Sequence, residues 1–108
     1  YTSLEYISRY WDLYQGLIQT YRDRFLFATD MVLTNDDRKD EKYVRDVFAC
    51  YRKMLEAKTY TGILIDRYLE DNHVAKTKDN RVFNGLHLDT ETLQHIYEIN
   101  PKKFLNIP

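Results

Sequence analysis

The chain has 108 residues, of which 44% are hydrophobic and 31% are charged, and its formal net charge is −1. This length suits one domain, and the charge balance excludes binding of nucleic acid through a broad basic field. The single cysteine excludes an internal disulfide and a cysteine-based zinc site. No apolar run approaches about 18 residues, so we expect no membrane-spanning segment.

The composition favours helices and contact with other proteins. Three glycines and two prolines are few for a β-sandwich or a loop-rich protein, and they suit a helical one. Ten tyrosines and one tryptophan are many for this length, and tyrosine both fills cores and is enriched at interfaces. We therefore expect a helical domain that makes buried contacts with partner chains.

Apolar and aromatic residues recur at alternating spacings of three and four over residues 1–32, which predicts one unbroken helix with one buried face. Other helices must cover this stripe, and we expect it to pack on the next helix with Trp11 in the core. Gly16 marks either the close approach of another backbone or ligand, or a tolerated surface glycine. The stripe consists of Leu4, Ile7, Trp11, Tyr14, Ile18, Tyr21, Phe25, Ala28 and Val32.

The first break falls at residues 34–37, Thr-Asn-Asp-Asp, which favour turns and helix caps. A second helix follows, and a bend at residues 58–62 separates it from a third helix. One continuous helix from about residue 37 to residue 73 is the alternative. The apolar residues are Val44, Val47, Phe48, Tyr51, Met54 and Leu55 in the second helix, and Ile63, Leu64, Ile65, Tyr68 and Leu69 in the third.

The last third of the chain is predicted to be less regular. Residues 71–81 form a polar connection. Asn84-Gly85 indicates a tight turn; of a very short hairpin and a loop, we favour the loop, because the flanking segments are too short for a sheet. Asp89 can cap a short helix over residues 90–99, which Asn100-Pro101 would stop. The apolar tail beyond it is expected to pack on its own bundle or on a neighbouring chain.

The predicted fold class is all-α. It is a three-helix bundle, with a long aromatic-rich first helix, followed by a short C-terminal helix and an extended tail. We interpret residues 1–108 as one helical domain in which residues 74–108 are a C-terminal extension.

The sequence predicts no catalytic, cofactor or metal site, and the chain is not expected to be an enzyme. Glu70 and His73 have the Glu-x-x-His spacing of di-iron bundles, but only one such pair is present. His87 and His95 lack an accompanying nucleophile, and Cys50 lies beside an apolar helix face, which predicts a buried thiol. No glycine-rich phosphate loop is present.

Basic residues cluster modestly. The two interpretations are a solvated face and a docking patch that orients an acidic partner protein. The clustered residues are Arg22, Arg24, Arg52, Lys53, Lys76, Lys78 and Arg81.

Two segments resemble the small mitochondrial LYR-motif proteins. Residues 13–18, Leu-Tyr-Gln-Gly-Leu-Ile, are similar to the Leu-Tyr-Arg element early in the family's first helix. Residues 43–48, Tyr-Val-Arg-Asp-Val-Phe, resemble the end of its second helix. The chain departs from the pattern at Gln15, where the family has arginine, and at Ala49, where arginine normally follows the phenylalanine. The resemblance covers roughly residues 7–70.

The resemblance implies a three-helix accessory subunit of a respiratory complex, an iron–sulfur assembly machine or a mitochondrial ribosome. It also implies binding of an acyl carrier protein whose acyl chain enters the bundle. The chain would then bind no cofactor directly and would meet only the acyl-phosphopantetheine of that carrier. With arginine missing at two positions, docking of the carrier would depend on other basic residues.

The predicted function is therefore that of a non-enzymatic accessory or adaptor subunit of a mitochondrial assembly, with other subunits as partners. The alternative is a freestanding bacterial or phage helical regulator, which would be cytoplasmic and would bind a protein or nucleic-acid target. The sequence begins at Tyr1 rather than Met, so either a segment was removed in the cell or the numbering starts inside a longer protein. The predicted partner-binding residues are Tyr14, Gln15, Arg22, Arg45, Phe48, Arg52, Lys53, Phe104, Leu105 and Ile107.

Overall fold

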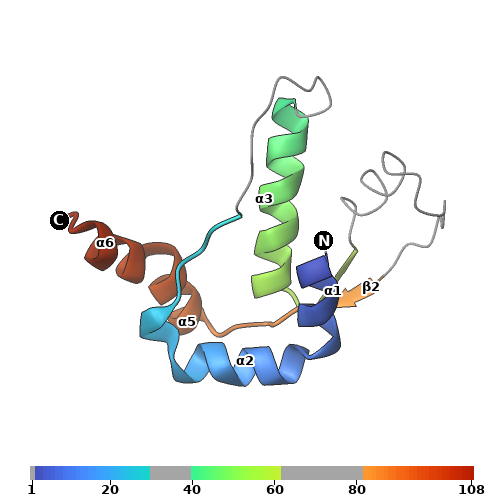
Figure 1. The fold of residues 1–108 in the computed structure, drawn as a ribbon, viewed down its shortest axis with the longest axis horizontal. Coiled ribbons are helices and arrows are strands. Elements are labelled where there is room, and N and C mark those ends of the chain that lie inside the picture. Colours follow the sequence, from blue (N-terminus) through green and yellow to red (C-terminus); the bar gives the residue numbers. More distant parts are fainter. Residues whose placement is uncertain (1, 30–39, 62–81) are drawn as a thin grey trace.

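A computed structural model of the chain describes residues 2–29, 40–61 and 82–108. The described residues are mostly helical, with one small antiparallel sheet of two strands (Figure 1). None of their helices is both long and apolar enough to cross a membrane. The α-helices are α1 (Thr2–Arg9), α2 (Trp11–Thr20), α3 (Glu41–Glu56), α5 (Thr90–Gln94) and α6 (Asn100–Leu105). A short 3-10 helix, η1 (Arg22–Arg24), follows α2, and a short π-helix, η2 (His95–Ile99), joins α5 to α6. The strands are β1 (Thr59–Thr61) and β2 (Val82–Asn84).

The prediction of one unbroken first helix is wrong. The helix breaks at Tyr10, where φ is −113° and ψ is 35°, and α2 ends before Tyr21, which has nearly the same angles. From Phe25 the backbone is extended. The break lets α1 lie beside β2 while α2 runs across the lower end of α3 (Figure 1). Contacts with distant parts of the chain therefore override the local helical pattern.

The predicted stripe is only partly buried as a result. Leu4 is 1% exposed, and Ile7, Tyr14, Ile18 and Phe25 pack half-buried against the core. Trp11 is 39% exposed and does not belong to the core, contrary to the prediction, and Tyr21 and Ala28 are also exposed. Val32 lies outside the described residues.

The second predicted helix is confirmed as α3. The side chain of Asp40 caps it by accepting a hydrogen bond from the Tyr43 N–H at 2.8 Å. Its buried residues are Val47, Cys50, Met54 and Leu55, whereas Phe48 is 42% exposed, contrary to the prediction. The alternative of a continuous helix over residues 37–73 is wrong, because α3 ends at Glu56. The predicted third helix, which contains Ile63 to Leu69, lies outside the described residues.

A two-stranded sheet corrects the prediction of a loop at residues 82–84. β1 and β2 are antiparallel, and Tyr60 lies opposite Phe83 in their register. Both side chains are buried, and their rings stack with centroids 5.6 Å apart. The partner of β2 is thus a strand more than twenty residues earlier in the sequence, which the local turn signal of Asn84-Gly85 did not reveal.

Residues 85–88, which we call the capping segment, close the C-terminal end of α3. The Leu86 N–H donates to the Met54 carbonyl at 2.7 Å, and the Leu88 N–H donates to the Leu55 carbonyl at 3.0 Å. The last carbonyls of a helix have no partner within the helix, so these two bonds satisfy groups that would otherwise be orphaned. Leu86 is fully buried and Leu88 nearly so, which places the segment in the core.

The C-terminal helix begins at Thr90, as predicted, but it continues beyond its predicted end at residue 99. Asp89 caps α5 by accepting a hydrogen bond from the Thr92 N–H at 2.7 Å, which confirms its predicted role. Pro101 does not stop the helix: the π-helix η2 precedes it, and α6 continues to Leu105. A proline lacks the N–H that an α-helical turn needs, and a wider turn beside it accommodates that loss.

Candidate functional site

A pocket of about 280 Å³ lies where α2, β1 and the capping segment meet. We call it the Trp11 pocket. Its position follows from the fold, since α2 crosses the end of α3 at the point where the capping segment passes (Figure 1). Its lining residues are Trp11, Gln15, Lys58, Thr59, Asn84, Gly85 and His87.

Hydrogen bonds hold the walls of the Trp11 pocket in place. The side-chain amide of Gln15 donates to the Leu86 carbonyl at 2.8 Å, which fixes α2 against the capping segment. The Gly85 N–H donates to the Lys58 carbonyl at 2.9 Å and joins the strand side of the pocket to the same segment. These bonds link residues far apart in the sequence, so the pocket is a product of the tertiary fold.

His87 has a strained backbone at the edge of this pocket. Its φ is 43°, in the left-handed region that favours glycine. A non-glycine residue held in that region costs about 1–3 kcal/mol. The conformation allows the His87 N–H to donate to the Ala57 carbonyl at 3.2 Å while its neighbour Leu88 bonds Leu55.

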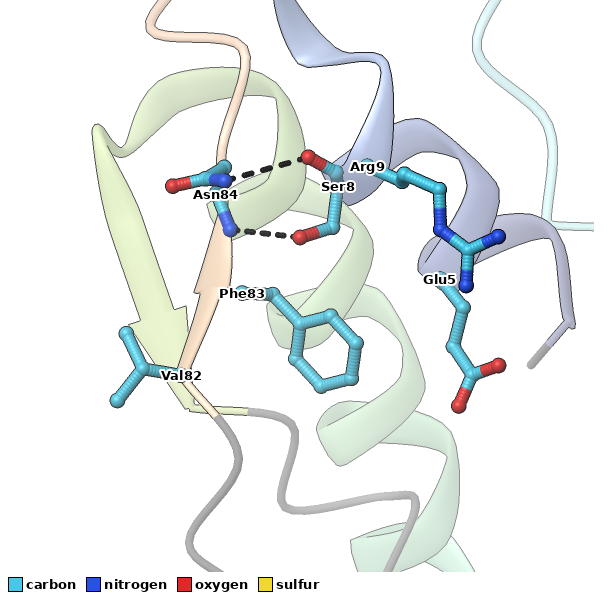
Figure 2. Close-up of a pocket in the computed structure, with 6 residues that line it drawn as sticks. All are labelled: Glu5, Ser8, Arg9, Val82, Phe83 and Asn84. Atoms are coloured by element: carbon cyan, nitrogen blue, oxygen red, sulfur yellow. Dashed lines mark hydrogen bonds between the residues drawn. The ribbon is translucent and has the colours of Figure 1, made fainter.

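A second, shallower hollow of about 460 Å³ lies between α1 and β2 (Figure 2). Ser8 and Asn84 bridge its two sides: the Asn84 N–H donates to the Ser8 hydroxyl at 2.8 Å, and the Asn84 side-chain amide donates to the Ser8 carbonyl at 3.3 Å. Figure 2 shows both bonds and shows Val82 and Phe83 on opposite sides of the strand. These contacts attach α1 to the sheet, and we interpret them as structural.

An aromatic cluster joins α3 to the segment after η1 and to η2. Phe27 lies 5.6 Å from Tyr97 and 6.2 Å from Phe48, measured between ring centroids. The Arg52 guanidinium lies 5.9 Å from the Tyr97 ring centroid, and it also pairs with Glu56 at 3.1 Å. The hydrogen bond to Glu56 raises the pKa of Arg52. The cluster therefore brings together two predicted partner-binding residues, Phe48 and Arg52.

The other predicted partner-binding residues lie in separate places. Tyr14 and Gln15 face the core side of α2, and Gln15 is occupied by its bond to Leu86. Arg22 pairs with Glu91 at 2.7 Å, and Arg45 pairs with Glu41 on α3. Lys53 is exposed on the same helix. At the far end of the molecule, Phe104, Leu105 and Ile107 are 73%, 60% and 53% exposed (Figure 1).

The Trp11 pocket itself was not predicted from the sequence. The place of Trp11 in the stripe predicts that it lies in the core, and the sequence predicts only a bend at Lys58. The sequence indicates for His87 only that no nucleophile accompanies it for catalysis. The usable signal was the sequence Asn84-Gly85, which marks a site where another backbone approaches closely.

Other candidates among the reactive or metal-binding side chains are either buried in the core or lie outside the described residues. Cys50 is buried, as predicted, and its burial raises the pKa of the thiol. Burial also raises the pKa of Tyr60. Within residues 2–29, 40–61 and 82–108, no three His, Cys, Asp or Glu residues are placed to hold a metal ion. Glu70 and His73 lie outside those ranges.

Comparisons of this chain with protein-family models, curated sequences and solved structures give no match.

Proposed function

We propose that this protein is a non-enzymatic helical accessory subunit that binds another protein through the outer side of α2. The observation that carries the proposal is that α2, a helix of ten residues, has no buried residue. Isolated helices of this length are marginal in water, so their stability comes from tertiary or quaternary packing. The inner side of α2 packs half-buried on the core through Tyr14 and Ile18. A partner surface would cover the outer side, which the described residues leave exposed.

The residues on the outer side of α2 have the character of an interface. Leu13 is 69% exposed, Leu17 45%, Tyr10 47% and Tyr21 46%. Leu13 and Leu17, four residues apart, lie on one side of α2, and Tyr10 and Tyr21 flank the helix at its two ends. We call these four residues the outer stripe. Single exposed apolar residues are normal, but an apolar row rich in tyrosine is typical of protein–protein contact.

The proposed occupant is an apolar surface of a different protein chain. The outer stripe contains no charged residue, so the affinity would come from burial of apolar area rather than from ion pairs. The exposed apolar side chains of Phe104 and Leu105 on α6, beside Lys102 and Lys103, would form a second contact with the same assembly.

Introducing a charge into the outer stripe tests this function. Leu13→Asp should abolish recovery of the partner subunits that co-purify with the intact protein, because a carboxylate would be buried without a counter-ion. Ala49→Asp is the matched control, since it adds the same charge at an exposed position of α3. Equal recovery with both variants, or formation of a homodimer that Leu13→Asp dissolves, would contradict the proposal.

The narrower form of the proposal rests on the resemblance to the LYR-motif proteins. In this form the chain is mitochondrial, the predicted third helix with Ile63 to Leu69 completes a three-helix bundle, and the partner is an acyl carrier protein. Arg22, Arg45 and Arg52 are already paired with Glu91, Glu41 and Glu56, and exposed pairs contribute only about 0–1 kcal/mol each. The acyl chain would therefore supply most of the affinity, at roughly 0.8 kcal/mol per buried CH₂.

A comparison of two carriers tests the narrower form. A carrier loaded with a long acyl chain should bind much more tightly than the unacylated carrier, with only modest dependence on salt. Equal affinity for the two forms, or no binding of either, would contradict it and would leave the broader subunit proposal standing.

A further inference from the structure

The side chain of His87 stands at the Trp11 pocket without a structural task among the described residues. The hydrogen bond from the His87 N–H to Ala57 uses the backbone alone, and glycine would adopt the same φ of 43° without strain. The imidazole is exposed, so its burial does not offset that strain. It remains available to a ligand in the pocket that it lines.

The charge of the pocket has one sign. Lys58 supplies an ammonium group, and no aspartate or glutamate is among the lining residues. Within the described parts of the chain, Lys58 is exposed and makes no ion pair. A hydrogen-bond donor on His87 and the indole N–H of Trp11 add to a set of groups that suits an anion.

The remaining surface of the pocket is aromatic. Trp11 is 39% exposed, so part of its indole is accessible to a ligand in the pocket that it lines. A flat apolar wall beside a cation recognises a ligand with an apolar body and an anionic end. The volume of about 280 Å³ is just below the usual range for small-molecule sites, roughly 300–1,000 Å³, and therefore suits a small ligand.

We propose that the Trp11 pocket binds a small free organic carboxylate. Lys58 and His87 hold the carboxylate, and the apolar body of the ligand lies against the indole of Trp11. Because Gln15 and Gly85 fix the walls through hydrogen bonds to backbone groups, the pocket is formed before the ligand arrives. The site lies on the inner side of α2 and is independent of the protein-binding role proposed for the outer stripe.

The chain carries its own probe, since Trp11 is its only tryptophan. Titration of the protein with phenylacetate should change the fluorescence of Trp11 saturably. Phenylacetamide has the same shape without the charge and should bind at least tenfold more weakly. Equal binding of the two compounds, or no saturable signal with phenylacetate, would overturn the proposal.

Substitutions locate the site. Lys58→Met should weaken phenylacetate binding at least tenfold, and His87→Gly should weaken it severalfold while leaving the protein at least as stable as the wild type. Lys53→Met removes an exposed lysine of α3 that does not line the pocket, and it should bind like the wild type. Unchanged affinity in Lys58→Met would overturn the assignment, and circular dichroism verifies that each variant is folded.

A protein terminus is the competing source of a carboxylate. A short peptide ending in a free phenylalanine carboxylate should bind no more tightly than phenylacetate if the site serves small free acids. Tight binding of the peptide together with no binding of phenylacetate would overturn the proposal in favour of a partner's C-terminus.

Discussion

The backbone of Gly85 lies against the carbonyl oxygen of Ala57 so closely that a β-carbon on Gly85 would be 1.9 Å from that oxygen. No real β-carbon tolerates such a contact, so any other residue would push the capping segment away from the end of α3. The contact is the point at which β2, the capping segment and the C-terminal turn of α3 are locked together.

Gly85→Ala should therefore destabilise the protein strongly, by about 3 kcal/mol or more, because the obstructing atom is backbone and cannot rotate aside. The hydrogen bonds from Leu86 to Met54 and from Leu88 to Leu55 would be lost with it. Urea unfolding followed by circular dichroism measures the change in the free energy of unfolding.

Gly16→Ala is the matched control. A β-carbon at Gly16 meets nothing within 4 Å, and the residue is exposed in the middle of α2. This finding favours the surface-glycine interpretation of the two left open by the sequence. Alanine should stabilise the helix by roughly 0.5–1 kcal/mol. A loss of stability in Gly16→Ala comparable with that in Gly85→Ala would contradict the contacts described for both glycines.

Local signals in the sequence predicted the local features well. The carboxylate cap at Asp89 and the apolar face of α3 depend on residues within one or two turns of each other. The break at Tyr10 was not predictable in this way, because it depends on Ser8 meeting Asn84 and on Gln15 meeting Leu86, more than seventy residues away. A periodic pattern reports which residues prefer one side of a helix, not whether the helix stays in one piece.

The same reason explains the missed pocket. Trp11 and His87 are separated by 76 positions, and only the passage of the capping segment under α3 brings them to one cavity. Trp11 was assigned to the core by its spacing alone. Its exposed fraction of 39% and its place in the pocket wall could emerge only from the three-dimensional arrangement.

Leu86→Ala should cost more stability than Trp11→Ala, although tryptophan is the larger side chain. Leu86 is fully buried, and truncation of a buried leucine costs about 2–5 kcal/mol. Trp11 is partly exposed, so its truncation should cost about 1–2 kcal/mol, less than the full burial value. Thermal melts of the two variants decide the order, and a larger loss in Trp11→Ala would restore that residue to the core.

The side chain of Asn100 should also contribute to the stability of the fold. Its buried side-chain amide donates to the carbonyls of Arg22 at 2.5 Å and Phe25 at 2.8 Å, and so anchors the chain where it leaves α2. Asn100→Ala would leave both carbonyls without this partner and should cost about 1–3 kcal/mol. Asn84→Ala removes one exposed side-chain hydrogen bond, to the Ser8 carbonyl, and should cost less in the same urea titration. Equal losses of unfolding free energy in the two variants would show that the burial of Asn100 does not strengthen the contribution of its hydrogen bonds.

The loss of folding stability at acidic pH should depend in part on Asp89. The backbone N–H of Thr92, which donates to this carboxylate, lowers the pKa of Asp89 below its ordinary value. Since the pKa is lower in the folded than in the unfolded state, the ionised group stabilises the fold above the unfolded pKa of about 3.9. That contribution is lost as the pH falls through the folded pKa.

Asp89→Asn isolates this charge, because asparagine keeps a capping oxygen but carries no charge near the helix N-terminus. The wild type should be more stable than the variant at pH 7, and the difference should shrink to near zero as the pH falls well below 4. Free energies of unfolding measured in urea from pH 7 to pH 2.5 give the two curves. A constant gap across that range would mean that geometry rather than charge makes Asp89 the cap. A gap that widens toward acid would contradict the lowered pKa, because it would require Asp89 to bind its proton more tightly in the folded chain than in the unfolded one.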